Sequence, residues 1–360
     1  MTSGSADGAQ RLRVAESLAP IDAAMRAAVD GIAISGAGEG DLRNFYGMLR
    51  YHLGWVDGNF APAQMPTGKR LRPLLLLRCV EACGGDPALA APAAAAVELL
   101  HNFTLVHDDV QDESAHRHHR ETIWHRWGTA AAINVGDALY AVAHDALYAL
   151  AEPPANLPAA RVLSLARDFD RMSLRIVEGQ HLDLSHEGHW DGGEARYLEM
   201  IAGKTAAIMA FAARAGATIA GADDATIATC HEFGLTLGLA FQIHDDSLGI
   251  WGAQDVTGKP VADDIRRRKQ SLPIVALDER ADEATRAELR RLYAGAAPLD
   301  DAAVAAIMGL LDRYEIIDYC TSRADEYHAR TRVALDRLAA RGAAIGGLRD
   351  FLALLEARAH

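Results

Sequence analysis

Three carboxylates stand close together in the segment DDVQD, at Asp108, Asp109 and Asp112. On a helix, positions i and i+4 lie on one face, so Asp108 and Asp112 stack with Asp109 beside them. Carboxylates this close repel one another, and Mg2+ relieves the repulsion because it takes oxygen ligands and bridges carboxylates to substrate phosphates. A largely apolar run over residues 99–106 leads into the cluster. This favours a magnesium site at the mouth of a core over a solvated acidic surface.

A second acidic pair, Asp245 and Asp246, repeats the pattern in FQIHDDSLG, with Gln242 one helical turn earlier. Lys259 and Lys269 follow soon after, and a mixture of Asp with Lys suits a bound polyphosphate better than a bare metal ion. A second carboxylate helix facing the first is expected to clamp a diphosphate between metal ions.

A basic segment, GKRLRP, places Lys69 and Arg72 at a predicted loop-to-helix boundary. Free backbone amides at a helix start, together with cationic side chains, form an anion site. His101 lies two helical turns before Asp108 and points the same way, so a second diphosphate is expected near the metal cluster. A histidine on an apolar helix can equally be a satisfied core residue, and this alternative stays open on the sequence alone.

Long helices are predicted to position these groups. Apolar residues recur at three- and four-residue spacing over residues 93–110, 129–150 and 204–219, and alternating strand patterns are scarce. Segments rich in Gly, Pro and Asp read as interhelical loops, and none has the length of a flexible linker. We therefore predict an all-α fold, a single large antiparallel helix bundle around a central cavity. Residues 1–15 are predicted to form a disordered tail, and residues 16–360 one domain.

Composition excludes several function classes. The net charge of −13 argues against a nucleic-acid partner, which needs a basic surface. The four cysteines in a long chain that shows no secretory signal favour reduced thiols and a cytoplasmic location. The Ala-rich stretch over residues 88–100 is interrupted by Pro92 and Glu98, so no stable membrane insertion is expected.

Several spaced motifs between residues 68 and 273 together resemble the trans-isoprenyl diphosphate synthases, and most closely the geranylgeranyl diphosphate synthases. The resemblance implies Mg2+ as cofactor, and isopentenyl diphosphate and an allylic diphosphate as substrates. It also implies a homodimer. GKRLRP and ELLH match the isopentenyl diphosphate site. DDVQD and FQIHDD match the two aspartate-rich motifs, and GKTA and GQHLDL match segments near the site. The roles implied are metal ligands at Asp108, Asp109, Asp112 and Asp245, further catalytic residues at Lys204 and Asp246, and substrate contacts at Lys69, Arg72, His101, Arg117, Thr205, Gln242, Lys259 and Lys269. Gln180 and Asp183 are expected near the site.

The chain departs from the family pattern at a few positions. His118 stands where a second arginine is usual, and His119 stands where glycine is usual. A neutral imidazole contacts phosphate less strongly than a permanently charged guanidinium. Gly249 replaces the last aspartate of the second acidic motif, a change that related synthases tolerate.

The implied reaction is ionisation of the allylic diphosphate, condensation with isopentenyl diphosphate and elimination of a proton. Bulk on the helix before the first motif is expected to limit the length of the product. Phe103 lies five residues and Thr104 four residues before Asp108. One aromatic residue beside one small residue resembles the pattern of geranylgeranyl diphosphate synthases, whereas two aromatics favour farnesyl diphosphate. The alternative is that Phe103 only packs in the core.

Other interpretations of the function remain open from the sequence alone. A class I terpene cyclase ionises a similar diphosphate but does not use isopentenyl diphosphate. A ferritin-like di-iron bundle is suggested by two Glu-x-x-His segments, at residues 113–116 and 178–181. The histidines at 116, 118, 119 and 125 could form a metal cluster, and a non-catalytic partner subunit is a further alternative.

Overall fold

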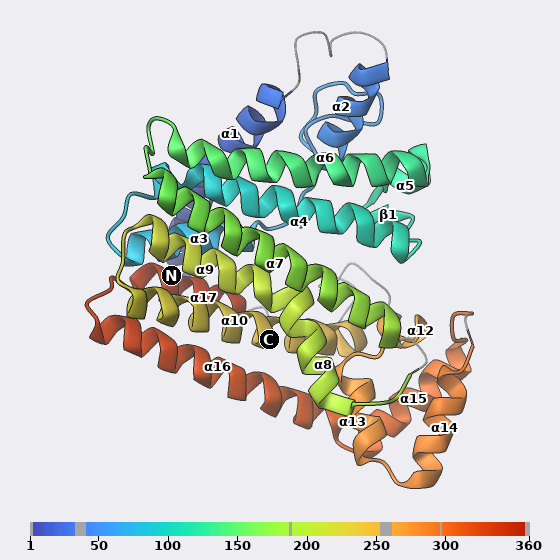
Figure 1. Cartoon of the computed structure of the whole chain (residues 1–360). Helices are drawn as coiled ribbons and strands as arrows, with labels where there is room; N and C mark the ends of the chain where they lie inside the picture. Colours follow the sequence, from blue (N-terminus) through green and yellow to red (C-terminus); the bar gives the residue numbers. More distant parts are fainter. Residues whose placement is uncertain (1–2, 33–40, 187–188, 253–260, 296, 357–360) are drawn as a thin grey trace. The chain divides into compact units, whose positions relative to one another are not determined.

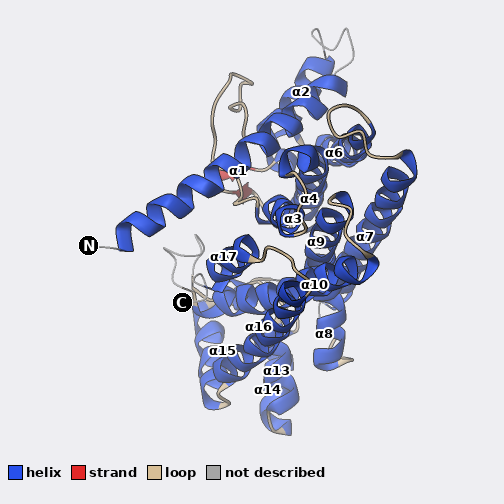
Figure 2. Cartoon of the chain, turned by 90° about the vertical axis from the view of Figure 1, so that its left-hand side faces the viewer, coloured by secondary structure: helices blue, strands red, loops and turns tan. Residues whose placement is uncertain are grey.

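The computed structural model describes residues 3–32, 41–186, 189–252, 261–295 and 297–356. Within these ranges the regular structure is helical (Figure 2). The exceptions are one hairpin whose two strands have two residues each, and an isolated bridge between Val56 and Pro62. The predicted all-α fold class is confirmed. By its internal contacts the chain divides into two compact units. The first unit comprises residues 1–168 and 215–222, and the second comprises residues 169–214 and 223–360.

The first unit holds the helices that carry the DDVQD and GKRLRP segments. Its elements are α1 (Ser3–Ile32), α2 (Asp41–His52), α3 (Leu71–Ala82), η1 (Pro87–Ala90), α4 (Ala91–Gln111), β1 (His116–Arg117), β2 (Arg120–Glu121), α5 (Ile123–Trp127), α6 (Thr129–Tyr148) and η2 (Ala149–Ala151). Helix α7 (Ala159–His186) contributes residues 159–168 to this unit, and α9 (Ala207–Ile219) contributes residues 215–219.

Helix α4 is the central element of the first unit and lies beside α6, as Figure 1 shows. The alanines at residues 93–96 are fully buried, because side chains this small let α1, α3 and α6 approach the α4 backbone closely. Residues 87–111 are also the only stretch in the described part of the chain that is long and apolar enough to cross a membrane, and 56% of its most apolar window is buried inside the structure. Burial of this kind is typical of a core helix.

The second unit carries the other acidic motif. Besides the remainder of α7 and α9, its elements are α8 (Gly193–Ile201), η3 (Ala202–Ala206), α10 (Asp224–Trp251), α12 (Asp263–Arg266), α13 (Leu272–Arg280), α14 (Glu283–Tyr293), α15 (Asp301–Arg313), α16 (Ile316–Ala340) and α17 (Gly346–Glu356). Three aspartates cap helix N-termini, and each carboxylate accepts a hydrogen bond from a first-turn backbone amide; they are Asp223 before α10, Asp282 before α14 and Asp300 before α15. Helix α10 packs along α16, and the Oγ1 atoms of Thr236 and Thr331 lie 2.9 Å apart in this buried contact.

The predicted domain boundaries stay a prediction. Helix α1 begins at Ser3, inside the segment expected to be a tail. Pro20 stands within α1, where it removes one backbone donor from the helix.

Candidate active site

The DDVQD carboxylates lie where α4 ends. Asp108 and Asp109 belong to its last turn, Asp112 follows as the C-cap, and no basic residue occupies that turn. A helix C-terminus carries partial negative charge, so carboxylates placed there are electrostatically unfavourable until a cation binds. Asp108 is partly buried and Asp112 is exposed, whereas Asp109 is buried. The two residues that stack at i and i+4 are therefore the accessible ones.

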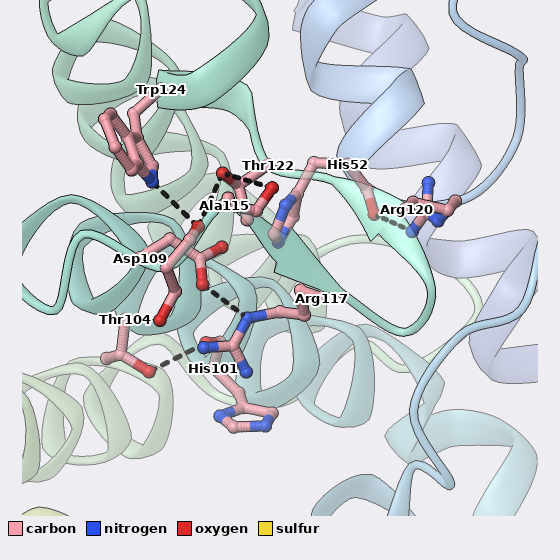
Figure 3. A network of polar contacts seen from close by, with 10 residues as sticks. His52, His101, Thr104, Asp109, Ala115, Arg117, Arg120, Thr122 and Trp124 are labelled. Carbon is pink, nitrogen blue, oxygen red and sulfur yellow. Dashed lines mark hydrogen bonds and ion pairs between the residues drawn. The ribbon is translucent and has the colours of Figure 1, made fainter. Parts of the chain in front are cut away.

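Asp109 is held by Arg117 rather than presented to solvent. The Arg117 Nε atom donates to Asp109 Oδ1 at 2.8 Å, and the Asp109 side chain is 3% exposed (Figure 3). Burial raises the pKa of the Asp109 carboxyl to about 6, although the Arg117 charge opposes the rise. Arg117 was predicted to contact a diphosphate, and in the structure one face of its guanidinium is already engaged with this carboxylate.

A tight hairpin aims Arg117 at α4. Strands β1 and β2 pair antiparallel, and the two residues between them, His118 and His119, have φ values of 49° and 62°. Two left-handed residues form the turn that suits a two-residue hairpin, and glycine adopts this conformation most easily. The turn therefore explains why the family pattern has glycine at the position of His119.

Arg120 does not replace the arginine that is missing at position 118. Its guanidinium donates to the Tyr51 backbone oxygen at 2.5 Å and to the His52 backbone oxygen at 3.1 Å, the second of which is drawn in Figure 3, so it caps the end of α2. The loop after α4 is fixed separately, because Thr122 Oγ1 and Trp124 Nε1 both donate to the Ser114 backbone oxygen at 2.8 Å.

Basic side chains gather around His101, which lies two helical turns before Asp108 on α4. Arg72, in the first turn of α3, approaches His101 Nε2 with its Nη1 at 3.1 Å. Burial lowers the pKa of His101 well below its usual value, with Arg72 and Arg117 adding to the effect. His52 belongs to the same group, and burial lowers its pKa to about 3. Neutral imidazoles beside two permanent cations can donate hydrogen bonds to an anion at neutral pH.

His52 was missed by sequence reasoning, because it lies 49 residues before His101 in an unrelated segment. Lys69 was predicted correctly as a loop residue, since it is exposed just before α3. Its neighbour Arg70 is engaged elsewhere, in an ion pair with Asp22 of α1.

The two residues expected to control product length face different surroundings. The Phe103 ring packs edge-on against Tyr140 of α6, with centroids 5.3 Å apart, and against His107 at 4.8 Å. Thr104 donates its hydroxyl to the His101 backbone oxygen at 2.7 Å (Figure 3). Since Thr104 precedes Asp108 by four residues, it lies on the Asp108 face of α4, whereas Phe103 is rotated roughly 140° from Asp108. Thr104 is thus the residue directly below the first acidic motif.

In the second unit, Asp246 is held by several hydrogen bonds. Its carboxylate accepts hydrogen bonds from Tyr197 Oη at 2.8 Å, Gln242 Nε2 at 2.8 Å and the Leu272 backbone amide at 3.2 Å. Burial raises its pKa to about 6, partly offset by the charge of Lys269. Tyr197 had no sequence signal, because it is an apolar-face residue of α8 that meets α10 only in the folded chain.

Lys204 and Thr205 are positioned by a π-helical turn, η3, between α8 and α9. Lys204 Nζ lies 2.5 Å from Asp183 Oδ2, and Thr205 Oγ1 donates to Gln242 Oε1 at 2.6 Å. Gly179 and Gly203 allow this arrangement, since a side chain on Gly179 would overlap the Lys204 backbone amide and one on Gly203 would lie 2.6 Å from the Arg175 oxygen. π-Helical turns of this kind often mark functional sites.

The remaining predicted contacts of the second motif are exposed. Asp245 and Lys269 are accessible at the surface of the second unit, and Lys259 lies outside the described residues. Asp245 is thus exposed, while its neighbour Asp246 is buried and held in place by its hydrogen bonds.

The donor set fits Mg2+ bound together with a substrate. Within the described ranges no three His, Cys, Asp or Glu side chains converge into a complete metal site. Mg2+ is commonly held by one or two carboxylates plus phosphate oxygens and water, so it does not need such a cluster. The histidine cluster and the di-iron site considered from the sequence gain no support, because both require several protein ligands on one metal.

The structure is similar to solved structures of prenyl synthases. The chain superposes on a polyprenyl synthetase from Streptomyces coelicolor A3(2) with a TM-score of 0.82 and 33% identity, covering 95% of this chain and 97% of that one. A polyprenyl synthase from Caulobacter crescentus, complexed with calcium and isoprenyl diphosphate, matches with a TM-score of 0.78 and 27% identity over 97% and 96% of the two chains. The helices and their acidic motifs thus have the architecture of all-α prenyl synthases.

The sequence is also similar to those of characterised short-chain prenyl diphosphate synthases. A geranylgeranyl diphosphate synthase of Mycobacterium tuberculosis is 46% identical over 247 residues, 68% of each chain. A (2E,6E)-farnesyl diphosphate synthase of Mycobacterium bovis is 42% identical over 227 residues, 63% of this chain and 61% of that one. The Polyprenyl synthetase family model matches residues 55–311, so the chain belongs to that family and the predicted resemblance is confirmed. It is a trans-prenyltransferase that makes a linear prenyl diphosphate.

Proposed function

We propose that the chain condenses isopentenyl diphosphate with allylic diphosphates, in a Mg2+-dependent reaction, and releases geranylgeranyl diphosphate. The observation that carries this proposal is the pairing of two kinds of site on one helix. Asp108 at the end of α4 belongs to the acidic set, and His101, seven residues earlier, contacts Arg72 at 3.1 Å. Seven residues of helix rise about 10 Å. A terpene cyclase needs the acidic residues around Asp108. It does not need the basic residues around Arg72 and His101, because it binds no second diphosphate substrate.

Two substrates are thereby assigned to two groups of residues. In the first unit, Asp108 and Asp112 would hold Mg2+ with the allylic diphosphate, and Asp109 lies beside them. In the second unit, Asp245 would bind Mg2+ with a diphosphate, and Asp246 lies beside it. Bound Mg2+ supplies positive charge that stabilises the leaving diphosphate. Lys69, Arg72, His101 and His52 bind the diphosphate of isopentenyl diphosphate, and the neutral imidazoles donate hydrogen bonds to it.

The condensation itself needs no protein nucleophile. Lys204, Thr205, Gln242 and Lys269 add charge and hydrogen bonds around the allylic diphosphate and favour its departure. The carbon–oxygen bond of the allylic diphosphate breaks first, and the double bond of isopentenyl diphosphate then attacks the allylic cation. A proton is then lost from the adduct to the departed diphosphate, which restores a double bond. The reaction requires that water be excluded, because water would otherwise capture the allylic cation.

Product length follows from the α4 residues below Asp108. Thr104 is small, so the growing chain can pass along the Asp108 face. Phe103 is rotated away from that face and packs against Tyr140 and His107, so we expect its ring to limit the chain where the chain turns from the Asp108 face toward α6. This favours geranylgeranyl diphosphate, the product named for the relative from M. tuberculosis, over farnesyl diphosphate.

We also propose a cytoplasmic homodimer. The free thiols of all four cysteines suit a reducing compartment, and Cys79, Cys230 and Cys320 are buried. On α6, Ile133 is 44% exposed and Tyr148 is 50% exposed, which gives the first unit apolar surface for a second copy. Light scattering after size-exclusion chromatography should give twice the chain mass of 38.6 kDa.

The test is incubation of the purified protein with Mg2+, labelled isopentenyl diphosphate and each of dimethylallyl, geranyl and farnesyl diphosphate. Dephosphorylated products are then separated by chromatography. We expect label in geranylgeraniol from every primer. Label that stops at farnesol would contradict the proposed length control, and hydrocarbon formed from an allylic diphosphate alone would identify a cyclase.

Substitution of Arg72 separates the two substrates. Arg72→Gln removes a charged donor worth about 1.5–3 kcal/mol, so KM for isopentenyl diphosphate should rise about 10- to 100-fold. KM for the allylic substrate should change little. Equal effects on both substrates would contradict the assignment of the cationic group.

A further inference from the structure

Two charged residues of α1, Asp22 and Arg26, contact the chain that connects α2 with α3. They are one helical turn apart, so they lie on the same side of the helix. The neighbouring stripe of Ile21, Met25 and Val29 is buried, and α1 packs against α3, α4 and α6. This packing fixes the places of Asp22 and Arg26 relative to the other helices of the first unit.

The connection between α2 and α3, residues 53–70, is held near both of its ends. The Arg26 guanidinium lies over the Trp55 ring, 4.4 Å from its centroid, at the start of the connection. Asp22 forms an ion pair with Arg70, the last residue before α3, and the Arg70 side chain is only 8% exposed. Helix α1 therefore braces the connection at its beginning and at its end.

Arg70 needs this support, because its backbone adopts a conformation that side chains disfavour. Its φ is 49° and its ψ is 42°, in the left-handed region, and its side chain makes no capping hydrogen bond to α3. A residue other than glycine keeps this conformation where its surroundings hold it. Burial lowers the pKa of Arg70, and the charge of Glu98, a residue of α4 that is 5% exposed, opposes the change. Carboxylates of α1 and α4 thus both attract the Arg70 guanidinium.

The residues next to this connection bind substrate in the function proposed above. His52 is the last residue of α2, and Arg72 stands in the first turn of α3. Lys69 directly precedes Arg70 and is exposed. A change in the Arg70 backbone would therefore shift Lys69 and Arg72 relative to His101.

We propose that Asp22 is a positioning residue for isopentenyl diphosphate. Through Arg70 it keeps Lys69 and Arg72 where they meet the diphosphate, so that these side chains need little further ordering when the substrate binds. Such preorganisation increases affinity, because groups already held in place lose less entropy on binding. The inference rests on the function proposed above, because it assumes that isopentenyl diphosphate binds beside Arg72 and His101.

The test measures KM for each substrate, together with the dissociation constant of isopentenyl diphosphate by titration calorimetry without an allylic substrate. Asp22→Asn keeps the side-chain shape and removes the charge. We expect KM and the dissociation constant for isopentenyl diphosphate to rise about 3- to 10-fold, because a long side chain must then be immobilised on binding. The value of kcat and KM for geranyl diphosphate should not change, and Asp22→Glu, which keeps the charge, should bind isopentenyl diphosphate as the original protein does.

A second variant tests whether Asp22 acts through Arg70. Arg70→Gln should weaken binding of isopentenyl diphosphate as Asp22→Asn does. The combined variant should bind no more weakly than Arg70→Gln alone, since both substitutions break the same ion pair. Additive losses would show that Asp22 does not act through Arg70 and would overturn the inference.

Asp30→Asn is the matched control. Asp30 lies on the same helix and pairs with Arg50 Nη2 at 2.7 Å, within the regular part of α2, where backbone hydrogen bonds already fix the chain. Its substitution also removes one ion pair of α1, but affinity for isopentenyl diphosphate should not change. Circular dichroism and thermal unfolding establish that each variant is folded.

Unchanged affinity in folded Asp22→Asn, or a loss no larger than in Asp30→Asn, would overturn the inference, and so would equal rises in KM for the two substrates. If label from isopentenyl diphosphate is not incorporated but its binding still depends on Asp22, the proposed function fails and this inference stands. If Asp22→Asn incorporates label with an unchanged KM, the proposed function stands and this inference fails.

Discussion

Removal of the Tyr197 hydroxyl tests whether the buried network at Asp246 holds the second acidic motif in place. In the structure this hydroxyl donates to Asp246 Oδ2 at 2.8 Å, and Tyr197 is 1% exposed. Tyr197→Phe deletes one of the donors to the carboxylate and leaves Gln242 and the Leu272 amide. Above pH 7 the carboxylate is ionised, because its pKa is about 6.

The size of the effect follows from the charge of the acceptor. A hydrogen bond to an ionised group contributes about 1.5–3 kcal/mol, and the two remaining donors keep the loss near the lower end, at about 2 kcal/mol. Urea unfolding followed by circular dichroism at pH 8 measures this free energy. A double-mutant cycle with Asp246→Asn should give a coupling energy of about 1–2 kcal/mol, since both substitutions remove the same charged interaction.

Tyr293→Phe is the matched control for this measurement. Tyr293 is also buried, at 4% exposed, but among the described residues its hydroxyl bonds only to the Lys269 backbone oxygen, at 3.5 Å. A contact this long contributes little, so the control should cost less than about 0.5 kcal/mol. Equal destabilisation by the two substitutions, or a coupling energy near zero, would refute the proposed role of Tyr197.

Three further expectations follow from the same contacts. Phe103→Ala should lengthen the product by at least one isoprene unit, and Thr104→Phe should shorten it to farnesyl diphosphate. Chromatography of the dephosphorylated products measures both changes, and unchanged products would rule out control of product length by α4. Gly179→Ala should lower kcat and destabilise the protein by about 1–3 kcal/mol, because its methyl group overlaps the Lys204 amide, and wild-type kinetics would contradict this close packing. In metal-free protein the raised pKa of Asp246 means that the folded state binds the proton more tightly than the unfolded state, so its contribution to stability is lost as pH rises from about 4 to about 6. The loss should be about 3 kcal/mol, and urea unfolding of Asp246→Asn across this range should lack it.

The motifs allowed the fold class and the family to be predicted, because each motif is local in sequence and its helical phase follows from spacing alone. The ligand residues stay a prediction. Helical phase also anticipates that Asp109 lies beside the Asp108 and Asp112 face, yet its burial against Arg117 depends on the hairpin that follows α4. That hairpin was not predicted, since each strand has only two residues.

The supporting residues could not be predicted, because they come from distant segments. Tyr197 meets Asp246 across 49 residues of sequence, and Arg120 caps α2 from 68 residues away. Sequence spacing reports which residues share a helix face, and tertiary packing decides what that face meets.

The most direct test of the account counts the inorganic pyrophosphate released for each isopentenyl unit incorporated. The protein is incubated with geranyl diphosphate and Mg2+, with and without labelled isopentenyl diphosphate, and released pyrophosphate and incorporated label are measured in the same sample. We predict one pyrophosphate for every isopentenyl unit incorporated, and almost none when isopentenyl diphosphate or Mg2+ is omitted. Pyrophosphate released at the same rate without isopentenyl diphosphate would contradict it, because the cationic group around Arg72 and His101 would then have no part in the reaction.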